Sequence, residues 1–303
     1  MNKDFKQLSI IGPTASGKSD LGLKIATKIN AYILSIDSLS IYKEIDIVSA
    51  KPSKKELKQV KHFGIDEIYP NEHFSVDIFI KLYKDVLKRC KKDNKNLVIV
   101  GGTSFYLKSL LEGLSPIPEL SLDAKVNVNK AMKDLEGAYN FLKLQDPDYM
   151  QNISANDSYR IEKAFIIFEG SKMSPSEWFK QNPPQPIIKD LPIFNIDVPR
   201  DVLRKRIQNR THKMLDLGLI DEVCYLEQKY TRLPNSMGAI GIVEVLEYLD
   251  GKIDKNEMLE LISTHTAQLA KRQQTFNKNQ FENIISAPLE ELEDIILSNK
   301  VIN

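Results

Sequence analysis

The segment Gly12-Pro13-Thr14-Ala15-Ser16-Gly17-Lys18-Ser19 matches the phosphate-loop pattern G-x-x-x-x-G-K-[ST] at every fixed position. The apolar run at residues 8–11 predicts a buried strand before it. Residues 20–29 repeat apolar side chains at near-helical spacing and predict a helix after it. In a strand–loop–helix unit, the loop N–H groups and the positive end of the helix dipole converge on a phosphate. The segment therefore predicts an α/β fold with a polyphosphate site.

Each position of this loop has a physical role. Gly12 and Gly17 allow a tight turn and a close approach of the backbone to the anion. Lys18 adds a positive charge, and the Ser19 hydroxyl is a candidate Mg²⁺ ligand. We predict that all eight residues bind a diphosphate or nucleotide. The motif leaves open which molecule carries the phosphate, and whether the phosphate is transferred or leaves.

The bulk composition is that of a globular protein. The 303 residues are 42% hydrophobic and 27% charged, and no apolar run reaches membrane-spanning length. With a net charge of +1, any nucleic-acid contact requires a local basic face. Cys90 and Cys224 are far apart in sequence, which argues against a disulfide framework or structural zinc. We expect a cytoplasmic protein without a membrane partner.

Two further strands are predicted to end in polar residues. The apolar run 31–36 leads into Asp37, and the run 97–100 leads into Gly101-Gly102-Thr103. The carboxyl ends of parallel strands face the ligand crevice in α/β sheets. Asp37 could be a Mg²⁺ ligand, a general base or a helix N-cap. Thr103 could cap a helix alone, or cap it and contact a ligand.

Residues 117–187 differ in composition and predicted secondary structure from the rest of the chain. They are polar and helical in pattern, and the proline-rich segment 181–186 ends them before strand character resumes at 191–198. We therefore predict an α/β fold with a P-loop NTPase-like parallel sheet flanked by helices. Residues 1–116 and 188–303 would form this core, and 117–187 an inserted small helical domain. A helical extension packed flat on the core is the rival interpretation.

Basic residues gather on two predicted helices. Arg206 and Arg210 lie four residues apart in the helix 200–215, so both point the same way, which favours a phosphate partner over a solvated face. Lys271 and Arg272 lie near the predicted end of the helix 255–274. The helix dipole alone is an alternative explanation for these two cations.

The ordered set of motifs carries more information than the phosphate loop alone. The set consists of Gly12 to Ser19, Asp37-Ser38, Ala50-Lys51-Pro52, Gly101-Gly102-Thr103, Arg206 with Arg210 and Met214-Leu215, Ala239-Ile240-Gly241, and Gln268-Leu269-Ala270-Lys271-Arg272-Gln273. Together these motifs resemble the tRNA dimethylallyltransferases (tRNA isopentenyltransferases, the IPP transferase family). The resemblance covers residues 10–278.

The resemblance implies a reaction and roles for the candidate residues. The family uses Mg²⁺ and transfers a dimethylallyl group from dimethylallyl diphosphate to N6 of the adenosine 3′ of the anticodon. This adenosine is at position 37 of tRNAs that read codons beginning with U, and the product is N6-(dimethylallyl)adenosine. Asp37 would be the general base, and Arg210 would join Lys18 and Ser19-bound Mg²⁺ in stabilising the leaving diphosphate. Thr103 would lie near the diphosphate or the flipped base.

The resemblance also implies tRNA as partner. The inserted domain would grip the anticodon stem-loop, and we expect the enzyme to act as a monomer. The implied tRNA-binding residues are Asp37, Ser38, Leu39, Ser40, Thr103, Tyr159, Arg160, Ile161, Glu162, Lys163, Lys271 and Arg272.

A P-loop kinase of a small metabolite or nucleoside is the alternative function. Every feature up to Gly102 fits it, with Asp37 as the base for a hydroxyl. A metabolite kinase needs neither the basic helix nor the helical insert nor the motif that ends at Gln273. A P-loop switch or motor ATPase has less support. In such proteins an acidic residue at the end of a strand binds Mg²⁺, but the predicted strand 97–100 ends in Gly-Gly-Thr.

Overall fold

The computed structural model describes residues 5–299, and the chain divides into two compact units. The core unit contains residues 1–108 and 190–303, and the helical unit contains residues 109–189. The sequence-based boundary at 116/117 lies eight residues after the one in this division, and the boundary at 187/188 lies two residues before it. Residues 1–4 and 300–303 of the predicted core lie outside the described residues.

The core unit is built on one six-stranded sheet with the order β3-β2-β4-β1-β5-β6. The strands are β1 (Gln7–Ile11), β2 (Ala31–Ser35), β3 (His62–Phe63), β4 (Asn96–Gly101), β5 (Ile193–Ile196) and β6 (Ile284–Ala287). Every neighbouring pair is parallel. The central strands are continuous apolar runs because helices cover both of their faces. This architecture confirms the predicted fold class.

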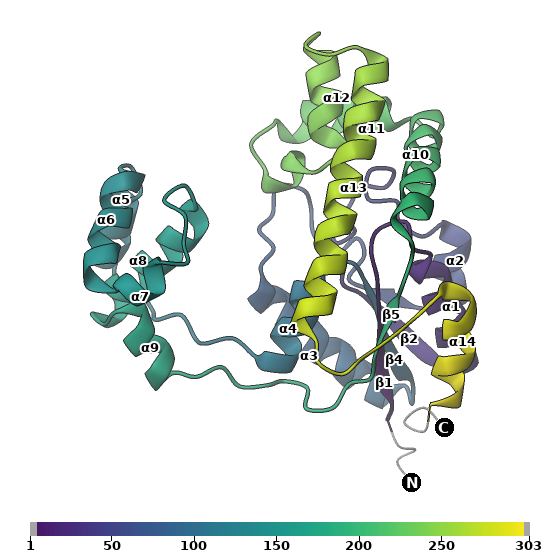
Figure 1. Ribbon diagram of the computed structural model, residues 1–303, viewed down its shortest axis with the longest axis horizontal. Coiled ribbons are helices and arrows are strands. Elements are labelled where there is room, and N and C mark those ends of the chain that lie inside the picture. Colours follow the sequence, from purple (N-terminus) through teal and green to yellow (C-terminus); the bar gives the residue numbers. More distant parts are fainter. Residues whose placement is uncertain (1–4, 300–303) are drawn as a thin grey trace. The chain divides into compact units, whose positions relative to one another are not determined.

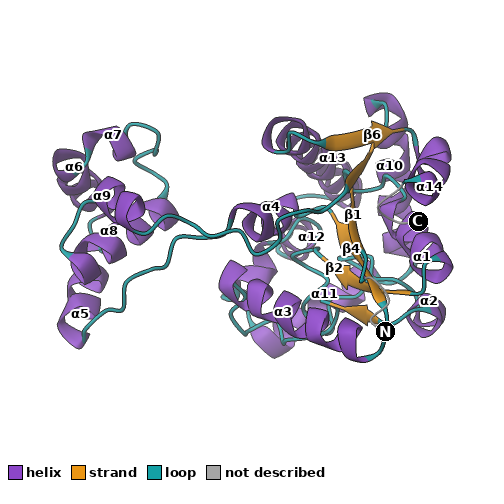
Figure 2. Cartoon of the chain, turned by 90° about the horizontal axis from the view of Figure 1, so that it is seen from below, coloured by secondary structure: helices purple, strands orange, loops and turns teal. Residues whose placement is uncertain are grey.

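Helices α1 (Lys18–Lys28) and α14 (Leu289–Ser298) cover one face of this sheet, and α3 (Val76–Lys92) covers the other (Figure 2). The short α2 (Lys54–Gln59) follows the loop after β2, and α4 (Ser104–Glu112) follows β4. The side chains of α1 and α14 pack with the sheet into one hydrophobic cluster. The phosphate loop and the residues after β2 and β4 therefore emerge at the same edge of a rigid sheet.

A second hydrophobic cluster lies beyond the carboxyl ends of the strands (Figure 1). It involves α10 (Arg200–Asp216), α11 (Leu219–Tyr230), η1 (Asn235–Gly238), α12 (Ile242–Leu249) and α13 (Lys255–Gln280). Apolar residues of the loop after β2, including Ile41, Ile45 and Val48, belong to the same cluster. This cluster closes the crevice that the sheet edge leaves open.

The helical unit has its own core. Its helices are α5 (Leu122–Ala131), α6 (Leu135–Gln145), α7 (Pro147–Met150), α8 (Ser158–Ser171) and α9 (Pro175–Gln181). Leu142, Met150 and Ile161 are fully buried in its hydrophobic cluster. Asp146 caps α7 and also accepts hydrogen bonds from Ser176 N and Oγ, which ties α9 to the α6–α7 junction.

The sequence-based expectation for the last long helix of the core needs correction. The predicted helix 255–274 continues as α13 to Gln280, so Lys271 and Arg272 lie inside it rather than in its last turn. The dipole therefore does not explain these cations, because its effect is confined to the helix ends. Within residues 5–299, the structure contains no helix with the length and apolar character needed to cross a bilayer.

Candidate active site

The phosphate loop connects β1 to α1 with a locally determined backbone. Ala15 and Gly17 have positive φ angles of 62° and 93°, and Ser16 N–H donates to Pro13 O over 3.2 Å. A Cβ at Gly17 would lie 2.8 Å from Leu289 Cδ2 of α14. Any side chain at Gly17 would therefore meet both an unfavourable φ and a packed neighbour. The loop curls as the sequence predicts for a phosphate cradle.

Gln273 of α13 joins this loop to the end of β4. Thr14 N–H donates to Gln273 Oε1 over 2.8 Å, and Gln273 Nε2 donates to the Gly102 carbonyl over 3.0 Å. A Cβ at Gly102 would lie 2.5 Å from Gln273 Nε2, so the glycine leaves room for this amide. No role for Gln273 follows from the sequence, although the residue lies in the C-terminal motif 268–273.

Arg206 and Arg210 of α10 both reach the phosphate loop. Arg206 Nη1 donates to Ser16 O over 3.3 Å, and Arg210 Nη1 donates to Thr14 Oγ1 over 3.4 Å. The i,i+4 spacing thus brings two guanidinium groups to one loop, as the sequence predicts. Arg210 also lines the cavity in front of the loop, where it can meet an anion.

The Lys18 ammonium lies among other charges. Its Nζ donates to Pro13 O over 3.2 Å. Desolvation lowers the pKa of Lys18 to about 8, Asp37 opposes this shift, and Arg210 adds to it. Desolvation likewise lowers the pKa of Arg210, again opposed by Asp37. An anion placed between these groups would restore the charge balance, so this corner is built for a negatively charged ligand.

Asp37 and Thr103 meet at the edge of the sheet. Asp37 Oδ1 accepts the N–H groups of Leu39 and Ser40 at 2.9 and 3.2 Å. Thr103 Oγ1 accepts the Ser38 N–H at 3.1 Å, so it ties the end of β4 to the segment after β2. Asp37 Oδ2 has no hydrogen-bond partner among the described residues. One carboxylate oxygen therefore caps a turn while the other remains available to a ligand.

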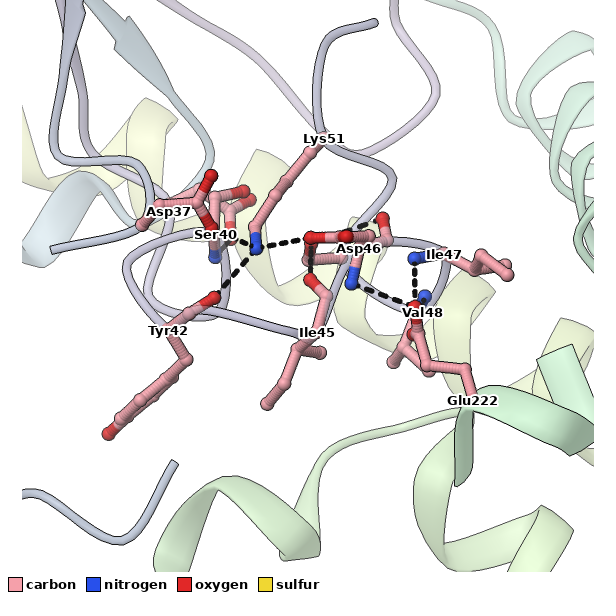
Figure 3. Close-up of polar contacts among 11 residues, drawn as sticks. Asp37, Ser40, Tyr42, Ile45, Asp46, Ile47, Val48, Lys51 and Glu222 are labelled. Atoms are coloured by element: carbon pink, nitrogen blue, oxygen red, sulfur yellow. Dashed lines mark hydrogen bonds and ion pairs between the residues drawn. The ribbon is translucent and has the colours of Figure 1, made fainter. Parts of the chain in front are cut away.

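Residues 37–51, here called the cavity loop, are held by two charged side chains (Figure 3). Lys51 Nζ, with 5% of its side chain exposed, donates to Tyr42 O, Asp46 Oδ1 and Asp66 Oδ1 at 2.6–2.7 Å. Glu222 of α11 accepts the N–H groups of Asp46, Ile47 and Val48. Lys51 belongs to the Ala50-Lys51-Pro52 motif, but the sequence predicts no role for its side chain, and no sequence pattern singles out Glu222.

Two adjoining cavities open around these groups. The smaller, about 70 Å³, is lined by the polar side chains of Lys18, Ser19, Asp37 and Arg210 among others. The larger, about 470 Å³, shares Thr14, Asp37, Ser49 and Arg210 with the first. Its further lining is mainly apolar, and includes Leu39, Tyr42, Val48, Tyr106, Met214, Leu219, Ile240 and Leu269. A charged end and an apolar end thus meet at Asp37 and Arg210.

The predicted magnesium ligand has a suitable position. Ser19 is exposed at the smaller cavity, which Asp37 also lines. Within residues 5–299 no cluster of three or more His, Cys, Asp or Glu could hold a metal ion. Mg²⁺ commonly takes one or two protein oxygens together with water and substrate phosphates. The oxygens present therefore fit Mg²⁺ bound with a polyphosphate and not a metal held by the protein alone.

The predicted tRNA-binding residues of the helical unit lie on α8. Tyr159 is 66% exposed and Lys163 Nζ lies 5.5 Å from the centre of its ring. Arg160 is exposed and pairs with Asp157. Ile161 is fully buried in the core of the unit, so its side chain packs internally and is not a contact for RNA. Glu162, on the same helix, is half-buried.

In the core unit, Lys271 and Arg272 are exposed on α13. Together with Phe276 they line a shallow pocket of about 510 Å³ on that helix. Ser38 is exposed, Leu39 is half-buried and Ser40 is buried after β2. These three residues share one turn with Asp37, so they lie next to the catalytic candidates.

Comparisons with known proteins agree with this geometry. Residues 40–280 match the family model described as IPP transferase. The chain is 70% identical over 292 residues to a tRNA dimethylallyltransferase of Sulfurimonas denitrificans, covering 96% of this chain and 98% of the relative. It resembles a crystal structure named tRNA delta(2)-isopentenylpyrophosphate transferase from Staphylococcus epidermidis, with 30% identity, a TM-score of 0.69 and 98% coverage of both chains.

A third match extends the fold comparison. A crystal structure titled as a eukaryotic dimethylallyltransferase acting on tRNA superposes with a TM-score of 0.82, covering 95% of this chain and 76% of the other. At 24% identity, this likeness concerns the fold.

Proposed function

The chain belongs to the IPP transferase family, and from this premise we propose that it is a tRNA dimethylallyltransferase. It would transfer a dimethylallyl group from dimethylallyl diphosphate to N6 of the adenosine 3′ of the anticodon. This adenosine is at position 37 of tRNAs that read codons beginning with U. One observation carries the proposal: a cationic, phosphate-loop cavity adjoins an apolar cavity, and both contain Asp37 and Arg210.

The charged end of the site suits the diphosphate. The loop residues 12–19 would hold it, with the Lys18 ammonium and the Arg210 guanidinium nearest the leaving oxygen. Both cations lie in a desolvated corner where electrostatic stabilisation is stronger than in water. As the C–O bond of the allylic substrate breaks, negative charge grows on the diphosphate and these cations stabilise it. Diphosphate would be the leaving group, so no phosphate is transferred.

The uncommitted oxygen of Asp37 suits the role of general base. Its partner oxygen is fixed by the N–H groups of Leu39 and Ser40, which orients the carboxylate. Asp37 would accept the proton from adenine N6 as N6 bonds to the prenyl carbon. Thr103 would fix the neighbouring turn through Ser38 and contact the diphosphate or the base.

Magnesium would be held by Ser19 together with diphosphate oxygens and water. When bound, it would supply positive charge that stabilises the leaving diphosphate. The support for Ser19 as the protein ligand is that it is the exposed hydroxyl residue of the phosphate loop and lines the smaller cavity.

The tRNA would present its base in a flipped conformation. A stacked adenine cannot reach an enclosed cavity, so the anticodon loop must extrude it at a cost of a few kcal/mol. Exposed basic and aromatic side chains on α8 (Tyr159, Arg160, Lys163) and on α13 (Lys271, Arg272) are the proposed RNA contacts. Guanidinium and ammonium groups meet phosphates, and aromatic rings stack on unpaired bases. We propose that one chain suffices, as a monomer.

The kinase alternative is not favoured. The relative at 70% identity carries the name of a prenyltransferase over nearly the full chain. A metabolite kinase also has no use for an apolar cavity of about 470 Å³ beside the phosphate loop.

The test is transfer of a radiolabelled dimethylallyl group to unmodified tRNA in the presence of Mg²⁺. We expect label on the adenosine beside the anticodon. The parallel reaction offers ATP labelled at the γ-phosphate with small metabolites and nucleosides. Label from ATP in a metabolite, and none in tRNA, would replace this proposal with the kinase.

A further inference from the structure

The cavity loop forms a wall of the apolar cavity, and part of its hold comes from another element of the fold. Val48 and Ser49 line the larger cavity, and Ser49 lines the smaller one too. This segment lies between β2 and α2 and contains no helix. Contacts within the loop, such as those of Lys51 with Tyr42 and Asp46, are joined by contacts from α11.

Glu222 of α11 holds the part of the loop that contains Val48. Its Oε2 accepts the N–H groups of Asp46 and Ile47 at 2.9 and 2.7 Å, and its Oε1 accepts the Val48 N–H at 3.0 Å. Consecutive N–H groups that point inward form an anion-binding concavity. Hydrogen bonds to an ionised carboxylate are about twice as strong as neutral ones. One half-buried side chain of α11 thus anchors three successive loop residues (Figure 3).

Val48 transmits this anchoring to the cavity. It is 6% exposed and packs against the start of α12, where a Cβ at Gly241 would lie 3.3 Å from Val48 Cγ1. Gly241 has a φ of 97°, and Ala239, Ile240 and Gly241 line the larger cavity with Val48. Val48 therefore stands between the Glu222 anchor and the larger cavity.

We infer that Glu222 is a positioning residue that, by fixing Val48, sets the selectivity of the apolar cavity for a five-carbon allylic group. The inference rests on the proposed function, because it takes the mainly apolar larger cavity as the space for the dimethylallyl group of the proposed substrate. Glu222 itself lines neither cavity. A fixed cavity wall favours the five-carbon dimethylallyl group. A loosened wall accepts a longer allylic group and packs less closely around the five-carbon group.

The chain offers a matched control on the same two elements. Lys229 of α11 also contacts the cavity loop, because its Nζ donates to Glu44 Oε1 at 2.7 Å and to Glu44 Oε2 at 3.0 Å. Glu44 is absent from the lining of both cavities. Lys229→Gln therefore removes a link between α11 and the loop without releasing Val48.

The experiment uses the full chain and its Glu222→Gln, Val48→Ala and Lys229→Gln variants. Glu222→Gln is nearly isosteric, but its amide NH₂ would face a backbone N–H in place of a carboxylate oxygen. Affinities are measured for inorganic diphosphate and for dimethylallyl diphosphate. Values of kcat/KM on unmodified tRNA are measured with dimethylallyl diphosphate and with the ten-carbon geranyl diphosphate.

We expect Glu222→Gln to lower the ratio of the two kcat/KM values, five-carbon over ten-carbon, by about tenfold. Binding of dimethylallyl diphosphate should weaken, whereas binding of inorganic diphosphate, held by the phosphate loop, should stay within about twofold of the wild type. Val48→Ala should reproduce the loss of selectivity. The double variant should show no more than the larger single effect, because both changes act on one wall.

An unchanged selectivity ratio in Glu222→Gln, or in Val48→Ala if the first variant does not fold, overturns the inference. So does an equal loss of selectivity in Lys229→Gln, since the effect would then be general loosening of the loop. These results leave the proposed function intact as long as the wild type labels tRNA. A wild type that fails to transfer the dimethylallyl group overturns both.

Discussion

The phosphate loop and the cavity loop line the same site, but different contacts set their backbones. In the phosphate loop the turn comes from local features, namely the positive φ angles at Ala15 and Gly17 and the Ser16–Pro13 hydrogen bond, and side chains of α10 and α13 add to it. In the cavity loop the backbone that carries Val48 is held by Glu222, which lies 174 positions from Val48.

The difference shows how binding and selectivity can be separated in one cavity. The local motif presents N–H groups and a cation to any polyphosphate. The second loop supplies the candidate base and the apolar wall, which decide what is done with the rest of the ligand. Changes in the first loop should therefore alter affinity for the diphosphate, and changes in the second should alter turnover and selectivity.

The largest effect is expected from Asp37→Asn in the cavity loop. The amide keeps an oxygen that can accept the Leu39 and Ser40 N–H groups, but it is not a base. We expect kcat to fall by about 10²–10⁴-fold. Affinity for dimethylallyl diphosphate and for tRNA should change little. Single-turnover transfer of labelled dimethylallyl groups checks this, with separate binding titrations. Near-normal turnover would remove Asp37 from the role of base.

Lys18→Met in the phosphate loop should have the next largest effect. A charge-assisted hydrogen bond contributes about 1.5–3 kcal/mol, which corresponds to roughly 10–150-fold in affinity for the diphosphate. Titration with inorganic diphosphate and with dimethylallyl diphosphate should show equal losses, because both share the lost contact. Arg89→Gln, on the surface of α3, is the control. A loss restricted to the prenylated ligand would contradict the division of roles between the loops.

The same lysine predicts a pH dependence. Desolvation lowers the pKa of Lys18 to about 8 in the free protein. The Lys18 side chain is therefore a charged ammonium below about pH 8 and loses its proton above it. Because the neutral amine attracts an anion less strongly, the affinity for inorganic diphosphate should decline as the pH rises through about 8. We expect up to about tenfold weaker binding one unit above the pKa. Lys18→Met should bind with a flat profile over this range. A wild-type profile as flat as that of the variant would contradict the assignment.

The smallest effect is expected outside both loops. The double substitution Lys271→Ala and Arg272→Ala should weaken tRNA binding by about three- to tenfold at moderate salt and reduce the salt dependence of binding. The KM for dimethylallyl diphosphate should not change. Lys252→Ala, a surface lysine paired with Asp250, serves as control. An unaltered salt dependence would exclude phosphate contacts by these two residues.

Much of the site is predictable from sequence because its elements are local. The glycine spacing predicts the phosphate loop, apolar runs predict β1, β2, β4 and β5, and i,i+4 spacing places Arg206 and Arg210 on one side of α10. The run of residues 159–163 was assigned to tRNA binding as a whole, although its side chains do not all face solvent. On a helix, neighbours in such a run point in different directions, and Ile161 points into the core of the helical unit.

The phosphate loop, the parallel sheet and the residues at the strand ends can be predicted from the amino-acid sequence. These features follow from backbone preferences and apolar periodicity, which act over a few residues. The contacts that hold the site together depend on the folded chain. Gln273 lies 259 positions from Thr14 along the chain. No sequence pattern distinguishes Glu222 from other glutamates on predicted helices. Their roles arise because folding brings an amide or a carboxylate to backbone N–H groups that need an acceptor.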